Sequence, residues 1–172
     1  MLYLLDANVL ITAHTLYYPV DRVPEYWAWL AHHCEAGNVK MPLETYEEVL
    51  DGTNDEERDH LYAWVSNDTV RQVLVLDRQV DVDAVRHVVS NGYAADLTDD
   101  EIDSLGRDPF LIAHGLADPK ESCVVTAEVS RPGKKRHNRK IPDVCASLGV
   151  RCCDPFAFTR DLRFSTDWDR RR

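Results

Sequence analysis

Carboxylates follow two apolar segments that are typical of buried strands. The run at 3–5 leads directly to Asp6, and a second run, at 123–125, leads through Thr126 to Glu128. Continuous apolar runs of this kind are expected in parallel sheets, which are covered on both faces. Because the carboxyl ends of parallel strands form the crevice where ligands bind, both carboxylates should face one site. The alternative for Asp6 is that it only caps the helix that follows it.

Further acids lie in segments with helical spacing. Three of them share one amphipathic segment: Glu44, Glu47 and Glu48. Glu44 and Glu48 are one turn apart and share a face, so this spacing also fits a solvated acidic face. Asp108 precedes Pro109 and an apolar segment, which predicts a helix with Asp108 as its N-cap and Pro109 as its first residue. Each of these acids alone therefore has a structural explanation.

Other catalytic chemistry has no support in the motifs. The seven histidines lack the HExxH spacing of zinc hydrolases. The sequence also has no GxSxG motif, phosphate-binding loop or dinucleotide fingerprint. The histidines are expected on the surface or in the core, and His14 and His114 are the two that could instead line a cleft.

Alternating strands and helices are needed to position these residues. A chain of 172 residues, 44% of them apolar, is long enough for one domain with its own core. The alternation predicts an α/β fold, a three-layer α/β/α sandwich with a central, mostly parallel sheet. We expect a single domain over residues 1–172, with a core at about 2–155 and a C-terminal extension at about 156–172.

Local patterns predict individual elements. Aromatic residues at helical spacing within 24–37 indicate a buried face rather than a platform for stacking bases. A helix is expected from Asn54, and Thr98 followed by Glu101 at the third position predicts a capping box. The apolar run at 73–76 fits either a strand or the start of a buried helix.

Composition limits the location and the partners. A net charge of -10 argues against a general nucleic-acid coat, yet cations are concentrated at 131–140 and 170–172. The five cysteines include no CxxC pair, which indicates reduced thiols in the cytoplasm rather than a zinc site or a disulfide framework. No apolar run approaches the roughly 20 residues of a membrane span, and no signal-peptide pattern opens the sequence. A membrane is therefore not an expected partner.

The order and spacing of the motifs resemble the PIN-domain nucleases, and within them the stand-alone prokaryotic PIN-like (VapC-like) toxins. The resemblance covers about residues 4–150. It rests on five segments: Leu5-Asp6-Ala7-Asn8, Glu48-Val49-Leu50-Asp51-Gly52, Asp108-Pro109-Phe110-Leu111-Ile112-Ala113, Val124-Val125-Thr126-Ala127-Glu128 and Lys140-Ile141-Pro142-Asp143-Val144-Cys145. The second motif, a glutamate with a glycine four residues on, selects Glu48 over Glu44 and Glu47. The fourth has Glu128 in place of the commoner aspartate, which leaves open whether this residue binds metal directly or through water.

The resemblance implies a divalent-metal-dependent ribonuclease. Its catalytic and metal-binding residues would be Asp6, Glu48, Asp108 and Glu128. Mg²⁺ or Mn²⁺ suits these oxygen ligands, with Asp6 and Asp108 as the primary ones, and would polarise the scissile phosphate and activate a water. Asn8 and Thr126 could hold the carboxylates in place through hydrogen bonds. Without a cation the carboxylates would repel one another, so at least one should be protonated or bridged by water.

The resemblance also suggests partners. These are an RNA substrate and, for a toxin of a toxin-antitoxin pair, an antitoxin protein; a homodimer is also compatible with the sequence. Because the basic segment directly follows Glu128, five of its residues are predicted to bind RNA phosphates: Lys134, Lys135, Arg136, Arg139 and Lys140. The alternative is a solvated loop, which would make the cations at 170–172 the better candidates. The alternative function is a catalytically decayed PIN-fold binding or regulatory module.

Overall fold

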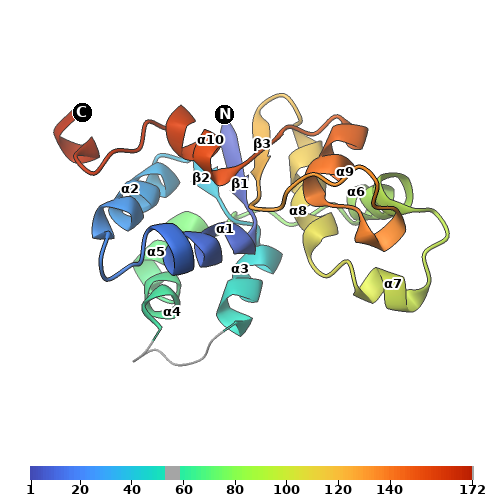
Figure 1. The fold of residues 1–172 in the computed structure, drawn as a ribbon, viewed down its shortest axis with the longest axis horizontal. Helices are drawn as coiled ribbons and strands as arrows, with labels where there is room; N and C mark the ends of the chain where they lie inside the picture. The colour runs from blue at the N-terminus through green and yellow to red at the C-terminus, as the bar shows by residue number, and fades with distance from the viewer. Residues whose placement is uncertain (53–58, 172) are drawn as a thin grey trace.

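Short parallel strands form the centre of the molecule. The computed structural model describes residues 1–52 and 59–171, and in this part of the chain four strands make one sheet of order β2-β1-β3-β4. The strands are β1 (Leu2–Leu5), β2 (Val39–Lys40), β3 (Ser122–Val125) and β4 (Cys152–Cys153). All neighbouring strands in this sheet run parallel. Helices lie on both sides of the sheet (Figure 1), which confirms the predicted three-layer α/β/α sandwich.

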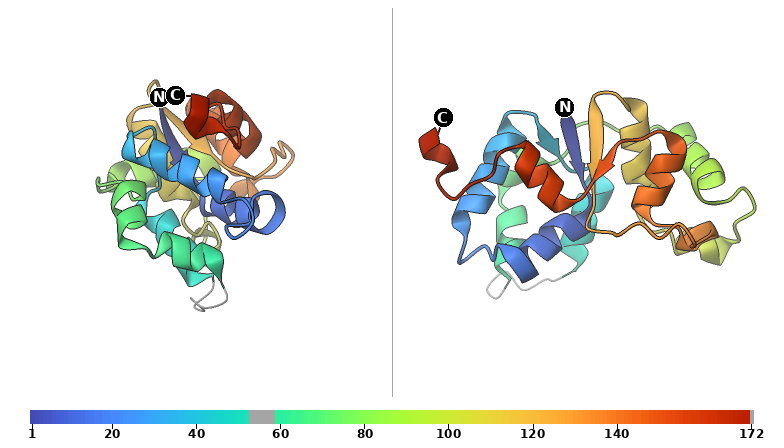
Figure 2. Two further views of the ribbon diagram at one scale, coloured as in Figure 1. Left: turned by 90° about the vertical axis from the view of Figure 1, so that its left-hand side faces the viewer. Right: turned by 45° about the horizontal axis from the view of Figure 1, so that its top comes forward.

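Each face of the sheet is covered by its own helical layer. Tyr3 and Leu5 of β1 belong to one apolar core and Leu4 to the other, because successive side chains of a strand point to opposite faces. The first layer contains α1 (Ala7–Thr12), α2 (Pro24–Glu35), α3 (Leu43–Asp51), α4 (His60–Val65), α5 (Asp68–Leu74) and α10 (Pro155–Asp161). The second contains α6 (Val82–His87), α7 (Asp99–Asp103), α8 (Asp108–Ala117) and α9 (Ile141–Leu148). The right-hand view of Figure 2 shows β1 and β3 between these layers.

Two helices continue into π-helical turns that the sequence does not signal. α1 runs into the turn Ala13–Tyr17, and α6 runs into Val88–Tyr93. Short 3-10 turns form at Arg136–Asn138 and Trp168–Arg171. Within the described ranges, no helix combines the length and the apolar composition needed to cross a membrane.

The structure settles two predictions about local elements. The ambiguous run at 73–76 divides, because α5 ends at Leu74 and Val75 then forms a single parallel bridge with the residue after β2. The predicted capping box is confirmed: the Thr98 side chain accepts from the Glu101 N–H, and the Glu101 side chain accepts from the Thr98 N–H.

One predicted helix start lies outside the described residues, and another differs from the prediction. Residues 54–58, where a helix is expected to begin, lie outside the described part of the chain, and α4 begins at His60. The Asp59 side chain caps α4 by accepting from two backbone N–H groups of its first turn. α8 begins at Asp108 itself, with Arg107 at the N-cap and without a side-chain cap. The prediction of Asp108 as the N-cap is therefore wrong by one position, because the backbone of Arg107 already has helical angles.

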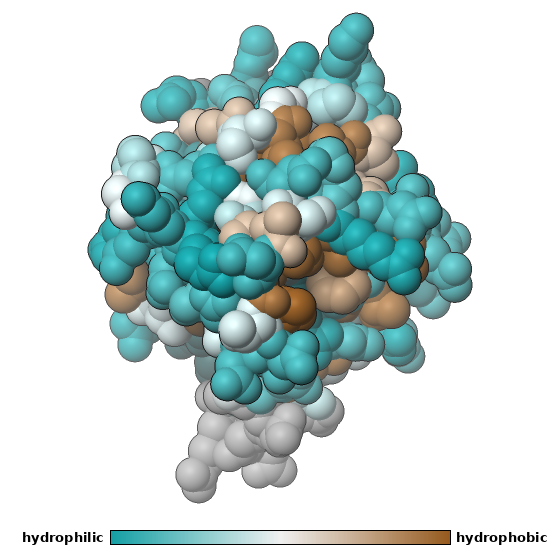
Figure 3. Space-filling model, turned by 90° about the vertical axis from the view of Figure 1, so that its right-hand side faces the viewer, coloured by the Kyte–Doolittle hydropathy of each residue, from teal (hydrophilic) through white to brown (hydrophobic). Residues whose placement is uncertain are grey.

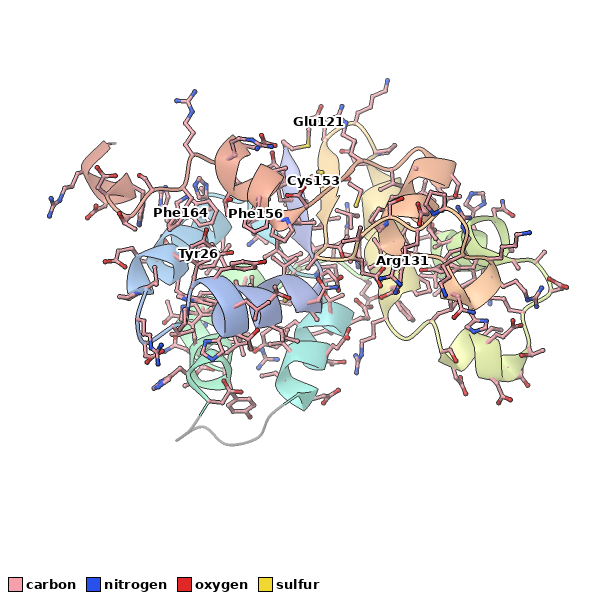
Figure 4. All side chains as sticks on the ribbon, viewed as in Figure 1. Tyr26, Glu121, Arg131, Cys153, Phe156 and Phe164 are labelled. Atoms are coloured by element: carbon pink, nitrogen blue, oxygen red, sulfur yellow. The ribbon has the colours of Figure 1, made fainter. Side chains whose placement is uncertain are left out.

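The aromatic residues of α2 lie in the core, as predicted. Tyr26, Trp27 and Trp29 are each at most 2% exposed. Residues of the C-terminal segment complete this cluster. Phe158 is fully buried, and the ring of Phe164 lies 5.3 Å from that of Tyr26 (Figure 4). All four tryptophans of the chain belong to this same core: Trp27, Trp29, Trp64 and Trp168. The segment after residue 155 therefore contributes side chains to the core of the first layer.

Close packing of α8 on the sheet depends on Gly115. A Cβ atom at this position would lie 2.8 Å from Val150 Cγ1 and 3.0 Å from Val124 Cγ2. These distances leave no room for a side chain unless its neighbours move. The glycine thus lets α8 lie directly against β3, and this contact fixes Asp108 relative to the strand ends.

The second layer carries an apolar groove on its surface. The groove has a volume of about 450 Å³ and is lined mainly by Val82, Val85, Val89, Ile102 and Phe110. Val82 is 58% exposed and Ile102 is 44% exposed. Figure 3 looks onto this end of the molecule and shows brown apolar side chains among teal hydrophilic ones.

Candidate functional site

Asp6 and the residues after β3 meet where the strand order of the sheet reverses. β1 pairs with β2 on one side and with β3 on the other. Such a switch point opens a crevice outside the carboxyl ends of the strands. Asp6 follows β1 directly, and its backbone N–H donates to the Val125 carbonyl at 3.0 Å. The two strand ends that the sequence places at one crevice are therefore neighbours.

A hydrogen-bond network joins these strand ends. Thr126 Oγ1 donates to Asp6 Oδ2 at 2.7 Å and accepts from Asn8 Nδ2 at 3.3 Å. It also accepts from the Glu128 N–H at 3.1 Å, while Asn8 Oδ1 accepts from the Ala127 N–H at 2.8 Å. Asp6 occupies the N-cap position of α1, but its side chain makes no capping hydrogen bond. The Asp6 carboxylate therefore serves this network, and the simple capping role is not observed.

Arg107 brings the two helical acids together. It lies just before Asp108 and donates to Glu47 Oε2 at 2.7 Å and to Asp51 Oδ2 at 3.1 Å. These ion pairs tie the start of α8 to the end of α3. Glu48 lies on this part of α3, and it repels the charged form of Asp108 strongly enough to affect the pKa of Asp108.

The three glutamates of α3 have different environments. Glu44 lies in the first turn of α3, beside the last turn of α8. Its Oε2 is 3.9 Å from Nε2 of the buried His114. Glu47 is engaged by Arg107. Glu48 lines the cleft described below. Periodicity alone does not separate these residues, and the position of α8 makes the difference.

Burial and mutual repulsion raise the pKa values of the acids. Burial, followed by repulsion from Glu48 and Glu128, raises the pKa of Asp6 to about 6, and this side chain is 4% exposed. Burial, followed by repulsion from Asp6, Glu128 and Glu48, raises the pKa of Asp108 to about 8. Burial also raises the pKa of Glu48, against the attraction of Arg107. The acids therefore share at least one proton at neutral pH, as expected for crowded carboxylates without a cation.

A polar cleft of about 630 Å³ adjoins the acids. Glu48, Asp108 and Glu128 line it together with Arg107 and with residues of the basic segment: Arg131, Lys134, His137, Asn138, Arg139 and Lys140. Arg131 lies at the level where β1 and β3 end (Figure 4). A separate cavity of about 700 Å³ lies between the start of α3 and the end of α5 and contains none of the four predicted acids. The smaller, polar cleft is therefore the candidate site.

Three cations of the basic segment are engaged within the protein. Arg136 donates to both carboxylate oxygens of Glu101 and to Asp96 Oδ1, at 2.7 to 2.8 Å. Arg139 donates to two backbone carbonyls. Lys140 forms an ion pair with Glu128, one of the four predicted acids. Arg136 and Arg139 therefore hold this segment against the second layer, which leaves fewer cations for a phosphate than the sequence suggests.

Two other cations of the segment point into the cleft. The side chains of Arg131 and Lys134 line it and make no hydrogen bond or ion pair with any other described residue. Lys135 is exposed but does not line the cleft. Of the terminal cations, Arg170 is exposed and residue 172 lies outside the described ranges. Arg131 and Lys134 are thus the cations best placed to contact a ligand in the cleft.

Arg107, His137 and Asn138 line the cleft, although no motif in the sequence predicts a functional role for them. His137 and Asn138 belong to the basic segment but carry no motif, and the only signal for Arg107 is its position next to Asp108. His14 and His114 do not line the cleft, because the His114 side chain is buried within α8 and His14 Nδ1 accepts a backbone hydrogen bond. Both histidines have structural roles.

The carboxylate oxygens of the four acids are ligands that suit a hard divalent cation. The acids supply only carboxylate oxygens, and burial, followed by repulsion between the acids, raises the pKa values of Asp6 and Asp108. As they stand, no three Asp, Glu, His or Cys side chains of the described residues converge as a complete ligand set. Glu128 is engaged by Lys140 at 2.5 Å. Asp6, Asp108 and Glu48 are thus the carboxylates that could hold a cation, with water completing its shell.

The same residues fall within a region that other proteins share. No curated protein matches this sequence. A family model described as a domain of unknown function (DUF4411) matches residues 3–166, which include both strand ends, α3, α8 and the basic segment. The chain therefore belongs to the DUF4411 family.

Proposed function

We propose that this protein is a divalent-metal-dependent endoribonuclease, a PIN-like hydrolase of RNA phosphodiester bonds. One observation carries the proposal: four acids from distant segments of the chain gather beside a cleft lined with cations. Acidic oxygens suit a metal ion, and cations beside them suit the phosphates of a polyanion. This combination suits metal-assisted hydrolysis of RNA.

The roles of the residues follow from their positions. Asp6, Asp108 and Glu48 would hold Mg²⁺ or Mn²⁺, which when bound polarises the scissile phosphate and activates a water. Thr126 orients Asp6 through its hydrogen bond of 2.7 Å. Arg107 holds the start of α8 against α3. These contacts fix the acids relative to one another before substrate binds, which lowers the cost of reaching the reactive geometry.

Cleavage of RNA tests the proposal directly. Purified protein with Mn²⁺ or Mg²⁺ should cut single-stranded RNA, because the bound cation would polarise the scissile phosphate and activate a water. Excess EDTA should stop the reaction, and fresh Mn²⁺ should restore it. Intact RNA at saturating Mn²⁺ would contradict the proposal.

A second candidate function is a binding or regulatory module that has lost catalysis. One observation favours it: Lys140 pairs with Glu128, so that one of the four acids is already neutralised by a cation of the protein. Such a module would bind RNA in the same cleft without cutting it. The cleavage assay combined with RNA binding separates the two candidates.

We also propose that the nuclease acts in the cytoplasm as a toxin restrained by an antitoxin protein. The apolar groove on the second layer supports a protein partner, because contiguous apolar surface on a small protein often marks an interaction site. Growth of a bacterial host that expresses active or inactive forms of the enzyme tests this role.

Replacing Arg131 and Lys134 together by alanine should weaken RNA binding in a salt-dependent way. Removing one cation that binds a phosphate lowers the slope of log affinity against log salt by roughly 0.7 for a single strand, so the slope should fall by roughly 1.4. Affinity for Mn²⁺ should change little, because neither side chain bonds an acid. Fluorescence anisotropy with a labelled oligonucleotide, in an Asp108→Asn background that prevents cleavage, measures the slope.

The matched control removes the same charge from the amino ends of the strands, at the other end of the sheet from the cleft. Lys120 and Arg151 precede β3 and β4, and both are exposed. Their double alanine variant should keep the wild-type slope. Equal slopes for the two double variants would show that Arg131 and Lys134 do not contact phosphates.

A further inference from the structure

Glu128 differs from the other three acids because both of its carboxylate oxygens are engaged. Oε1 accepts from Lys140 Nζ at 2.5 Å, and Oε2 accepts from the Ile141 N–H at 2.8 Å. The backbone N–H of Glu128 is held by Thr126 as well. A carboxylate whose two oxygens are each bound within the protein would have to share or give up one of these bonds to bind a metal directly.

Lys140 is held at the acids by this contact. It occupies the N-cap position of α9, and its side chain, 35% exposed, lines the cleft with Asp108 and Glu48. Its positive charge lowers the pKa of Asp108, against the stronger effects that raise it, so the ammonium group acts on the acids themselves. An ammonium group has three donors, and Glu128 takes one of them. The remaining donors are available to a ligand in the cleft.

We propose that Glu128 is a positioning residue that fixes the Lys140 ammonium group beside the acids, where Lys140 contacts a phosphate of the bound RNA. The inference rests on the proposed nuclease function and assigns different roles to its fourth acid and to the lysine. Asp6, Asp108 and Glu48 then hold a single divalent cation. A second divalent cation would require Glu128 to release the lysine, and the fixed ammonium group supplies positive charge in its place.

A charge-balanced double variant tests this assignment. Glu128→Gln combined with Lys140→Met removes one negative and one positive charge, so the net charge of the cleft is unchanged. The glutamine oxygen can still accept from the Ile141 N–H. Calorimetry should therefore give one bound Mn²⁺ with an affinity close to that of the wild type. Removal of a true metal ligand would instead weaken Mn²⁺ binding by at least about 10-fold.

RNA binding supplies the second measurement. With cleavage blocked by Ca²⁺ in place of Mn²⁺, Lys140→Met should lower the salt slope by roughly 0.7, the value for one phosphate of a single strand that is no longer bound. Glu128→Gln should lower it by a similar amount, because the lysine loses its anchor, and the double variant should add little to either single change. Lys140→Arg, which keeps the charge, should retain most of the slope. Circular dichroism confirms that each variant is folded.

The outcomes separate this inference from the proposed function. Wild type that binds no Mn²⁺ overturns the metal-dependent function and this inference with it. Wild type that binds Mn²⁺, together with a double variant that binds it at least about 10-fold more weakly, makes Glu128 a ligand and overturns this inference alone. An unchanged salt slope in Lys140→Met would likewise overturn the proposed binding of phosphate by Lys140.

Discussion

Asp108→Asn should abolish RNA cleavage while leaving the fold intact. Loss of one carboxylate from a metal site removes several kcal/mol of transition-state stabilisation, so kcat should fall on the order of 10³-fold. Asparagine has the same shape and relieves the repulsion that Asp108 meets from Asp6, Glu48 and Glu128. Gel assays of RNA cleavage at saturating Mn²⁺ measure the loss of activity, and circular dichroism measures the fold.

The matched control lies at the other end of the same helix. Asp118 follows α8 and is exposed, and Asp118→Asn should keep wild-type activity. Expressed in a bacterial host, wild type and Asp118→Asn should both slow growth, whereas Asp108→Asn should not. Co-expression of the proposed antitoxin, which is expected to be the product of the neighbouring gene, should restore growth. Full cleavage by Asp108→Asn would show that the acids of this cleft are not the catalytic ones.

The metal-free protein should become less stable as the pH rises from 6.5 to 8. Burial and repulsion raise the pKa of Asp108 from 3.8 to about 8, so the folded protein binds more protons than the unfolded protein between these values. The free energy of unfolding must then fall with rising pH, by about 1 kcal/mol per pH unit for one such group. Asp6, with a pKa of about 6, adds to this trend at the lower end of the range.

The pH window excludes most of an opposite effect of His114 on stability. Burial, with a smaller contribution from Arg78, lowers the pKa of His114 from 6.5 to about 4. The unfolded protein then binds more protons below pH 6.5, and stability falls as the pH falls from 6.5 towards 4. Urea denaturation in EDTA at pH 6.5 and 8 measures the effect above this range. Asp108→Asn should be more stable than wild type at pH 8 and nearly insensitive to pH, and equal slopes for both proteins would contradict the raised pKa.

The strand-end acids could be placed from the sequence because a parallel sheet leaves few alternatives. Apolar residues on both sides of Asp6 and before Glu128 identify buried strands, and the carboxyl ends of such strands share one edge. The three-layer architecture follows from the same alternation. The π-helical turns after α1 and α6 could not be predicted, because π-helical turns are rare and leave no clear pattern in side-chain type.

Two features of the site could be decided only from the tertiary structure: which glutamate of α3 reaches the cleft, and which cations of the basic segment are already paired. Glu44 and Glu48 share a face of α3, and the packing of α8 decides which of them reaches the cleft. The motif spacing of the PIN resemblance selects Glu48, but periodicity does not. The sequence gives no sign that Arg136 is paired. In the structure it pairs with Asp96 and Glu101, which lie 40 and 35 positions earlier. No local pattern encodes a pairing over that distance.

The placement of the tryptophans determines what intrinsic fluorescence can report. All four belong to the core of the first layer, whereas α8 and α9, which carry Asp108 and border Lys140, pack on the other face of the sheet. Emission should therefore follow the unfolding of the first layer and remain nearly blind to an opening of the second. Circular dichroism sums the helices of both layers. Coincident midpoints for the two signals would mean that the layers unfold as one cooperative unit, and an earlier dichroism midpoint would mean that the layer carrying the cleft opens first.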